Sequence, residues 1–339
     1  MARLLDRAPA ALRVWLSGQP PVRVDDQALD PTLQMAMALR PAHGRAALTR
    51  EDPPAARARL RRETAAARGP QTPVADVATL SVQGAEASLR GRLYRPIGVG
   101  RPPLVVYYHG GGFTQGDLET HDEPCRLIAA SSGHAVLSVA YRRAPEHPFP
   151  AAADDAVAAF RWAQDHAAGL GTDARRVCVA GDSAGGNLAA VVAQQTRGDR
   201  PPLAQLLLYP ATDPHTPRPS RERFDGFFLA AEERAAFDEL YTGGTDADPR
   251  DPRHAPIHGT LGGLAPALVV TAGFDVLRDE GEAYAAALEQ AGTPAQAYRE
   301  PALVHGFVNL TGVSRACHAA TVRLAERWRS LVAEQEPAA

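Results

Sequence analysis

The sequence contains no lysine, so all 36 of its residues counted as lysine or arginine are arginines. This absence excludes chemistry that depends on a lysine amine, including Schiff-base catalysis, a phosphate-binding P-loop lysine and a serine–lysine dyad. Positive charge is not in excess either, since the formal net charge is −3. We therefore expect no nucleic-acid partner.

Cysteine and long apolar runs are also scarce. Cys125, Cys178 and Cys317 form neither a C-x-x-C pair nor a zinc-binding signature, which indicates reduced thiols in a cytoplasmic protein. No run approaches the roughly 18 apolar residues of a membrane span, and the N-terminus lacks the apolar core of a signal peptide. We expect no membrane span, no bound metal and no cofactor.

From residue 74 onward, short apolar runs alternate with helical patterns. The patterns predict strands at 77–82, 87–94, 104–108, 135–139, 177–180, 203–209, 267–272 and 295–298, and helices at 120–131, 151–167, 187–195, 277–291 and 313–332. We interpret the first two strands as a hairpin of edge strands. Strands that alternate with helices favour a mostly parallel sheet covered on both faces. The predicted class is therefore α/β.

Two segments depart from this alternation. Residues 1–70 have helical tendency and are interrupted by Pro-Pro pairs at 20/21 and 53/54. Residues 213–260 are rich in proline, aspartate, arginine and histidine, with one helix near 230–241. We predict that 71–339 form the catalytic domain, and that 1–70 and the insertion 213–260 are two parts of a mainly helical cap.

The clearest motif is Gly181-Asp-Ser-Ala-Gly185, between the strand at 177–180 and the helix at 187–195. It fits the G-x-S-x-G nucleophile elbow, in which a strand turns abruptly into a helix. The residue at the bend must be strained, and small residues two positions to either side let the backbones pass. Ser183 is therefore the candidate nucleophile; a glycine-rich turn without chemistry is the alternative.

A second glycine-rich motif, His109-Gly-Gly-Gly-Phe113, directly follows the strand at 104–108. Successive glycines let main-chain N–H groups point toward one spot without obstruction by side chains. Such donors stabilise the negative charge that a carbonyl oxygen gains in acyl transfer. We expect an oxyanion hole here and a structural role for His109; a flexible surface loop is the alternative.

A serine nucleophile needs a base to take its proton. Of the eleven histidines, His305 follows a predicted strand by a short loop and lies downstream of the other motifs, which makes it the candidate base. His254 and His258 in the predicted cap and His318 on the last helix are the other candidates, and each has an ordinary core or surface interpretation.

The base in turn needs an acceptor that fixes its tautomer. Asp275 lies on the loop after the strand at 267–272, whereas Asp279 and Glu280 occupy the first turn of the next helix, where they suit the helix dipole. We predict Asp275 as the partner. The chain order Ser183, Asp275, His305 is the order expected of an α/β-hydrolase.

Together the motifs resemble the hormone-sensitive-lipase-like branch of the α/β-hydrolases, the bacterial family IV esterases. The resemblance covers roughly residues 75–330 and rests on five ordered motifs: His109-Gly-Gly-Gly-Phe113, Tyr141-Arg-Arg-Ala-Pro-Glu-His-Pro-Phe-Pro150, Gly181-Asp-Ser-Ala-Gly-Gly186, Asp275-Val-Leu-Arg-Asp-Glu280 and His305-Gly-Phe307. Two positions depart from the family pattern. Val276 stands where proline is usual, and Arg143 stands where leucine or a similar residue is usual.

The resemblance implies an α/β-hydrolase fold and a role for each matching residue. It makes Ser183 the nucleophile, His305 the base and Asp275 its partner, with oxyanion N–H groups from Gly111, Gly112 and Ala184. It also implies a possible homodimer through the edge strand at 295–298. For Asp182, support of the active-site loops and a merely structural turn role are equally open.

The predicted function is a serine carboxylic ester hydrolase that acts on short- to medium-chain acyl esters through an acyl-enzyme. The residues themselves favour acyl transfer, and the preference for small-molecule esters comes from the resemblance. An amidase or a lactone or carbamate hydrolase with the same triad is the nearest alternative. A non-catalytic small-molecule receptor on this fold is another, although such a receptor is expected to lack a triad member.

Overall fold

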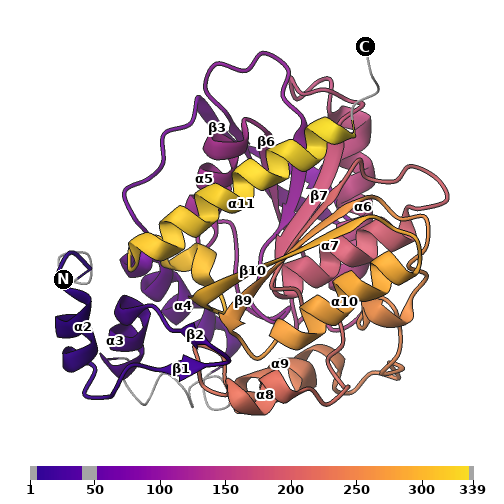
Figure 1. Ribbon diagram of the computed structural model, residues 1–339. Coiled ribbons are helices and arrows are strands. Elements are labelled where there is room, and N and C mark those ends of the chain that lie inside the picture. Colours follow the sequence, from indigo (N-terminus) through magenta and orange to yellow (C-terminus); the bar gives the residue numbers. More distant parts are fainter. Residues whose placement is uncertain (1–5, 40–51, 336–339) are drawn as a thin grey trace.

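One eight-stranded sheet forms the centre of the computed structural model, which describes residues 6–39 and 52–335 (Figure 1). The strand order is β10-β9-β8-β7-β5-β6-β4-β3. The strands are β3 (Asp76–Gln83), β4 (Ser88–Arg95), β5 (Leu104–Tyr108), β6 (Ala135–Ala140), β7 (Val177–Asp182), β8 (Gln205–Leu208), β9 (Ala267–Phe274) and β10 (Ala295–Val304).

Most neighbouring strands in this sheet run parallel. Only the pairs β3–β4 and β4–β6 are antiparallel, and every other pair is parallel. The strands β5, β7 and β9 are buried along their whole length, because helices cover both faces. This burial explains their continuous apolar runs. The predicted α/β class with a mostly parallel sheet is confirmed.

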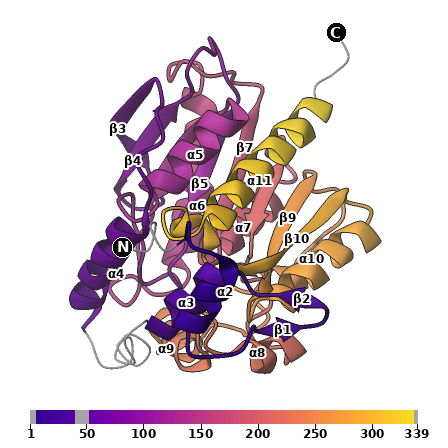
Figure 2. The ribbon, with the colours of Figure 1, turned by 60° about the vertical axis from the view of Figure 1, so that its left-hand side comes forward.

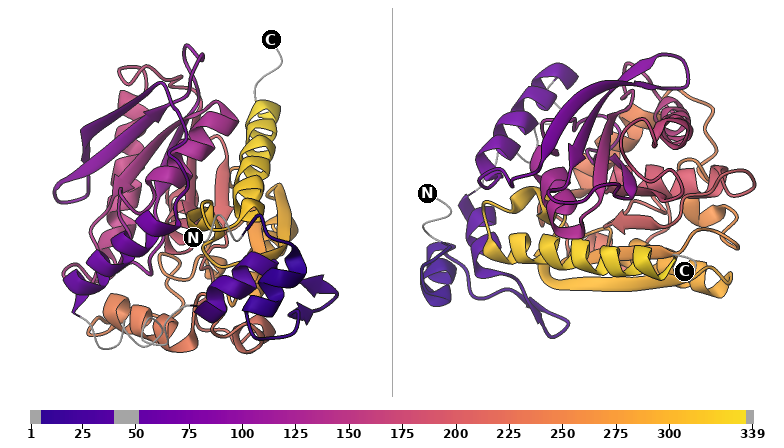
Figure 3. Two further views of the ribbon diagram at one scale, coloured as in Figure 1. Left: turned by 90° about the vertical axis from the view of Figure 1, so that its left-hand side faces the viewer. Right: turned by 90° about the horizontal axis from the view of Figure 1, so that it is seen from above.

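The helices form one layer on each face of the sheet. On one face lie α5 (Asp122–Ser132) and α11 (Arg315–Glu334), which cross in front of the strands in Figure 2 and flank them in Figure 3. On the other face lie α6 (Ala151–His166), α7 (Ala184–Gln195) and α10 (Arg278–Gln290). Each layer has its own apolar core. The three cysteines are buried and free, as predicted for reduced thiols.

Two predicted boundaries near the site and one predicted edge strand were wrong. The helix α7 begins at Ala184 rather than at 187, because the bend is confined to Ser183. The strand β10 extends to Val304, so that His305 follows it directly and not through a loop. The strand β4 is an inner strand, since it pairs with both β3 and β6, and only β3 of the hairpin is at an edge.

The predicted cap segments gather at one end of the sheet, in the lower part of Figures 1 and 2. The first contains α2 (Ala10–Leu16), β1 (Arg23–Val24), β2 (Gln27–Ala28), α3 (Pro31–Leu39) and α4 (Pro53–Ala67). The second contains α8 (Pro219–Arg223), α9 (Ala231–Thr242) and the 3-10 helix η2 (Pro256–His258). Residues 1–5 and 40–51 of the first segment lie outside the described residues.

Two details of the first segment differ from expectation. A small β1–β2 hairpin follows the first Pro-Pro pair, and the second pair begins α4 instead of interrupting a helix, since proline suits the first helical turn. An ion pair of 2.6 Å between Asp25 and Arg223 links the hairpin to α8. Within the described ranges no helix is both long and apolar enough to cross a bilayer.

Candidate active site

Ser183 occupies the sharp turn between β7 and α7. Its backbone angles, φ 55° and ψ −119°, are unfavourable for a residue with a side chain. The turn also brings backbones very close together, because a Cβ at Gly181 would lie 2.1 Å from the Gly185 oxygen, and one at Gly185 would lie 1.9 Å from the Tyr108 oxygen. The expected strain at Ser183 and the need for small neighbours are both confirmed.

Two residues from adjacent strands approach the Ser183 hydroxyl. Asp275 is the first residue after β9, and His305 is the first after β10; these strands pair in parallel, with Val304 opposite Phe274. His305 Nδ1 lies 2.9 Å from Asp275 Oδ2, and His305 Nε2 lies 3.0 Å from Ser183 Oγ. With the proton on Nδ1, the carboxylate accepts from Nδ1–H and Nε2 can accept from the serine hydroxyl.

The surroundings of His305 stabilise its protonated form more than water would. Burial lowers the pKa of His305, but the charge and hydrogen bond of Asp275 raise it by more, so the pKa lies above its ordinary value. A neighbouring carboxylate therefore stabilises the imidazolium, the form that a general base becomes once it has accepted a proton.

The rival carboxylates have other partners. Glu280 is fully buried and forms an ion pair of 2.7 Å with Arg221, while Asp279 accepts from Ser220 N–H at 2.8 Å and from Arg278 Nε at 2.9 Å. Of the three acidic candidates, the structure therefore brings Asp275 to His305.

The rival histidines are also engaged elsewhere or exposed. His258 and His318 are exposed. His254 is buried against Phe149 and Tyr241, with ring centroids 6.0 and 5.7 Å apart, and its pKa is lowered by burial. Of the histidine candidates, the structure brings His305 to Ser183.

The glycine-rich loop after β5 lies beside the serine. Gly111 and Gly112 have φ of 123° and 58°, conformations that favour glycine. The Gly111 carbonyl accepts from the N–H groups of Thr114 and Gln115 at 3.1 and 2.8 Å. Within the described part of the chain, the N–H groups of Gly111, Gly112 and Ala184 donate no hydrogen bond, and Ala184 N–H opens the positive end of α7.

Asp182 connects the glycine-rich loop to buried residues beneath it. Its buried carboxylate accepts from Gly110 N–H at 2.9 Å and from the Tyr107 hydroxyl at 2.7 Å, and it lies 3.3 Å from His121 Nε2. Burial raises the pKa of Asp182, but the contact with His121 and these hydrogen bonds lower it by more. Sequence reasoning left the role of Asp182 open and missed His121, which belongs to no motif.

His109, for which we predicted a structural role, is buried near Asp182. Its ring is fully buried and stacks on Tyr141 with ring centroids 4.3 Å apart, and its Nδ1 lies 3.0 Å from the Gly110 oxygen. Burial lowers the pKa of His109 to about 3, so the ring is neutral. A neutral, stacked imidazole suits the structural role expected for it.

A cavity of about 500 Å³ opens at the serine. Its wall includes the glycine-rich loop, Leu60 and Thr64 of α4, and Arg234 and Phe237 of α9. Both predicted cap segments thus contribute to the same cavity. Phe237 lies directly over the loop, because a Cβ at Gly112 would be 2.2 Å from its ring.

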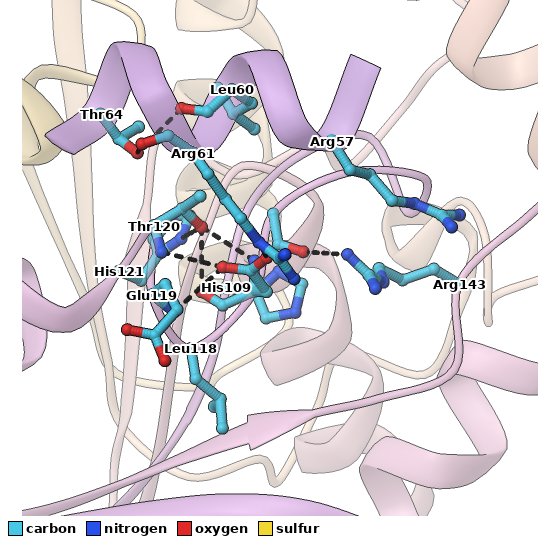
Figure 4. A network of polar contacts seen from close by, with 12 residues as sticks. Arg57, Leu60, Arg61, Thr64, His109, Leu118, Glu119, Thr120, His121 and Arg143 are labelled. Atoms are coloured by element: carbon cyan, nitrogen blue, oxygen red, sulfur yellow. Dashed lines mark hydrogen bonds and ion pairs between the residues drawn. The ribbon is translucent and has the colours of Figure 1, made fainter. Parts of the chain in front are cut away.

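Arginines fasten α4 beside this cavity. In Figure 4, Arg61 extends from α4 toward His109, whereas Arg57 extends to the side on which Arg143 lies. Arg61 forms an ion pair with Asp117, and Arg57 donates to the Thr114 oxygen at 2.8 Å and to Glu146 at 2.6 Å. These contacts hold the helix against the loop that follows β5.

Comparison with known proteins places this arrangement in a family. Residues 105–309 match the family model described as alpha/beta hydrolase fold. The carboxylic ester hydrolase LipN of Mycobacterium tuberculosis is 44% identical over 97% of this chain and 90% of its own length. The esterase LipI of the same organism is 42% identical over 76% of this chain and 82% of its own length.

Solved structures of ester hydrolases also resemble this chain. An ester hydrolase from the metagenome of Lake Arreo is 40% identical with a TM-score of 0.84, and the match covers 89% of this chain and 98% of that one. A thermostable esterase from Pseudomonas putida is 33% identical with a TM-score of 0.85, covering 95% and 100%. The chain therefore belongs to the alpha/beta hydrolase fold family and, within it, to the hormone-sensitive-lipase-like carboxylic ester hydrolases. The predicted family, fold and enzyme class are confirmed.

Proposed function

We propose that this protein hydrolyses short- to medium-chain acyl esters through an acyl-enzyme formed on Ser183. The observation that carries the proposal is the continuous row from Asp275 through His305 to Ser183, with contacts of 2.9 and 3.0 Å, at the opening of a cavity of about 500 Å³. A positioned base next to a hydroxyl, with an acceptor behind it, is the arrangement that activates serine.

In the acylation half, Ser183 Oγ attacks the ester carbonyl while His305 Nε2 takes the hydroxyl proton. The carbonyl oxygen becomes negative and is held by the N–H groups of Gly111, Gly112 and Ala184, each worth about 3 kcal/mol to the transition state. The Asp275 carboxylate stabilises the imidazolium. His305 then gives its proton to the leaving alkoxide, the C–O bond breaks, and the alcohol departs.

In the deacylation half, a water molecule replaces the alcohol. His305 takes one proton from the water as its oxygen attacks the acyl carbon, and the same N–H groups hold the oxyanion. The bond to Ser183 Oγ breaks, the serine recovers a proton from His305, and the carboxylic acid leaves. Apart from the substrate and this water molecule, the steps use only groups of the chain.

The size preference follows from the cavity. About 500 Å³ is within the range of roughly 300–1,000 Å³ that holds small organic ligands, and Phe237 narrows it above Gly112. We include in the proposal that 1–70 and 213–260 act as a cap over the domain 71–339, because both segments contribute walls through α4 and α9. Esters of short and medium acyl chains fit such a space best.

The test is hydrolysis of p-nitrophenyl esters from acetate to palmitate by the wild type, Ser183→Ala and Ser132→Ala. Ser132 is a matched control, because its hydroxyl is buried in α5 and donates to the Ile128 oxygen at 2.7 Å. We expect saturable activity that is highest on short or medium chains, is lost in Ser183→Ala and persists in Ser132→Ala. Activity that survives in Ser183→Ala, or a wild type that cleaves p-nitroanilides but no ester, contradicts the proposal.

We also propose that two chains pair through β10. This strand is at the edge of the sheet, and within the described residues its only ladder partner is β9. Asp30 N–H donates to the Ala302 oxygen near the end of β10, so the outer backbone groups at 295–298 are the ones that can pair with another strand. Light scattering after size exclusion should give the mass of a dimer for the wild type and of a monomer for Gln296→Lys, since a charged edge opposes strand pairing. A monomeric wild type contradicts the proposal.

A further inference from the structure

Three potential metal ligands converge in the segment 213–260. His215 lies in the loop after β8, Asp238 on α9, and His254 in the loop before η2. One ligand atom of each residue lies within 4.8 Å of the others, and no other group of this kind occurs in the ranges that the structure describes. Ester hydrolysis as proposed above uses none of the three.

The geometry of the pair Asp238–His254 matches a metal site better than a hydrogen bond. Asp238 Oδ1 lies 3.3 Å from His254 Nε2, within ion-pair distance, and this buried oxygen accepts no hydrogen bond within the described part of the chain. Ligands held about 2.1 Å from a tetrahedral Zn²⁺ are about 3.4 Å apart. Two of the three donors are therefore already at the ligand–ligand spacing, and a ring nitrogen of the exposed His215 lies within 4.8 Å of both.

His254 is the fixed member of the cluster. Its ring is buried, and the Asn187 side-chain amide of α7 donates to its main-chain oxygen at 2.6 Å. Asp238 belongs instead to α9, next to Phe237, which lies over Gly112 in the cavity. A metal ion bound by both Asp238 and His254 would therefore connect α9 to α7.

We propose that His215, Asp238 and His254 bind one divalent transition metal ion that ties α9 to the body of the protein. Two imidazoles and one carboxylate suit Zn²⁺, Co²⁺ or Ni²⁺, whereas Mg²⁺ and Ca²⁺ prefer oxygen ligands alone. Water completes the coordination. The ion is a clamp on the wall of the cavity and takes no part in the reaction.

Calorimetric titration of chelator-treated protein with Zn²⁺ tests the site directly. The wild type is expected to bind one ion per chain, and His215→Ala to bind it at least roughly tenfold more weakly, since removal of even an outer partner of a ligand costs this much. His215 is exposed and outside the cavity, so the variant should fold and keep its metal-free esterase activity. His318→Ala, which removes an exposed histidine of α11, is the matched control and should bind like the wild type.

Two further readouts make the test specific. At a Co²⁺ concentration that just saturates the wild type, the visible absorption of a low-coordinate site should appear in the wild type and in His318→Ala, and should be much weaker in His215→Ala and Asp238→Asn. Zn²⁺ should slow amide hydrogen exchange in α9 of the wild type and leave His215→Ala unchanged. Absence of binding, or equal affinity in His215→Ala, overturns the site; binding that depends on His215 without slower exchange in α9 overturns the clamp.

Discussion

Replacement of Asp182 tests how the glycine-rich loop after β5 is held in place. The buried carboxylate accepts from Tyr107 at 2.7 Å and from Gly110 N–H at 2.9 Å, both at Oδ1. Its other oxygen lies 3.3 Å from His121 Nε2 and 3.4 Å from the Tyr209 hydroxyl. We expect Asp182→Asn to weaken this arrangement and Asp182→Leu to abolish it.

The contacts set the expected size of the effect on stability. Asparagine keeps an oxygen for the two short bonds but removes the charge, and a hydrogen bond to a charged group is worth about 1 kcal/mol more than a neutral one. With the two longer contacts weakened, the cost is about 3 kcal/mol. An unfolding entropy of about 2.1 cal/mol/K per residue converts this into a Tm lower by roughly 4 °C. Leucine leaves Gly110 N–H and the Tyr107 hydroxyl buried without a partner, at about 1–3 kcal/mol each in addition.

The effect on the rate follows from the position of Gly110, which directly precedes Gly111 and Gly112. Loss of one oxyanion donor costs roughly 10²–10³ in kcat. We expect a loss of this size for Asp182→Leu, and about a tenfold loss for Asp182→Asn, which keeps the bond to Gly110. KM should change less than kcat, because the Asp182 side chain lines the cavity but is buried and exposes little surface to it.

The assay is steady-state hydrolysis of p-nitrophenyl butyrate well below the Tm of each variant, with Tm from scanning calorimetry. Asp155→Asn is the matched control: this carboxylate is equally buried, and it accepts from Arg142 Nε at 2.9 Å and from Ala85 N–H at 3.0 Å, away from the cavity. It should lower Tm and leave kcat unchanged. If Asp182→Leu loses stability as expected but retains wild-type kcat, the carboxylate does not position the loop.

The remaining predictions concern the base and the cavity. The kcat/KM of the wild type should rise with pH through an apparent pKa above the ordinary 6.5 of histidine, because Asp275 favours the protonated, inactive form of His305. Asp275→Asn should move that inflection to lower pH and reduce kcat by roughly 10³–10⁴; an unmoved inflection in the pH profile argues against the pairing. Gly112→Ala should lower kcat by roughly 10²–10³, because the new Cβ collides with the ring of Phe237 at a positive φ. Phe237→Ala should raise the ratio of decanoate to butyrate hydrolysis, and a constant ratio would show that Phe237 does not limit the acyl chain.

Much of the fold could be predicted because its central elements have strong local patterns. The apolar run 104–108 coincides with β5, and the run 177–180 locates β7 within two residues, since buried parallel strands are continuously hydrophobic. The strained turn at Ser183 was also predictable, because only small residues fit two positions away. Edge elements were less certain: β10 carries exposed residues and was therefore predicted too short.

Contacts between segments that are far apart in the sequence could not be predicted from local patterns. The contact of His121 with Asp182 joins residues 61 positions apart, and neither the spacing nor the neighbours of His121 indicate it. The cluster of His215, Asp238 and His254 is spread over 40 positions without a ligand motif, so the sequence does not indicate that these side chains meet. The β1–β2 hairpin consists of two-residue strands, too short for any periodicity to appear.

The central claim is that Ser183 carries the acyl group, and the most direct measurement is the mass of the covalent intermediate. Wild type, Ser183→Ala and Ser132→Ala are mixed with p-nitrophenyl butyrate, quenched in acid during turnover, digested and examined by mass spectrometry. The account predicts one butyryl group on the peptide that contains Ser183 in the wild type and in Ser132→Ala, and none in Ser183→Ala. A butyryl group on another residue, or turnover by Ser183→Ala at the wild-type rate, would contradict it.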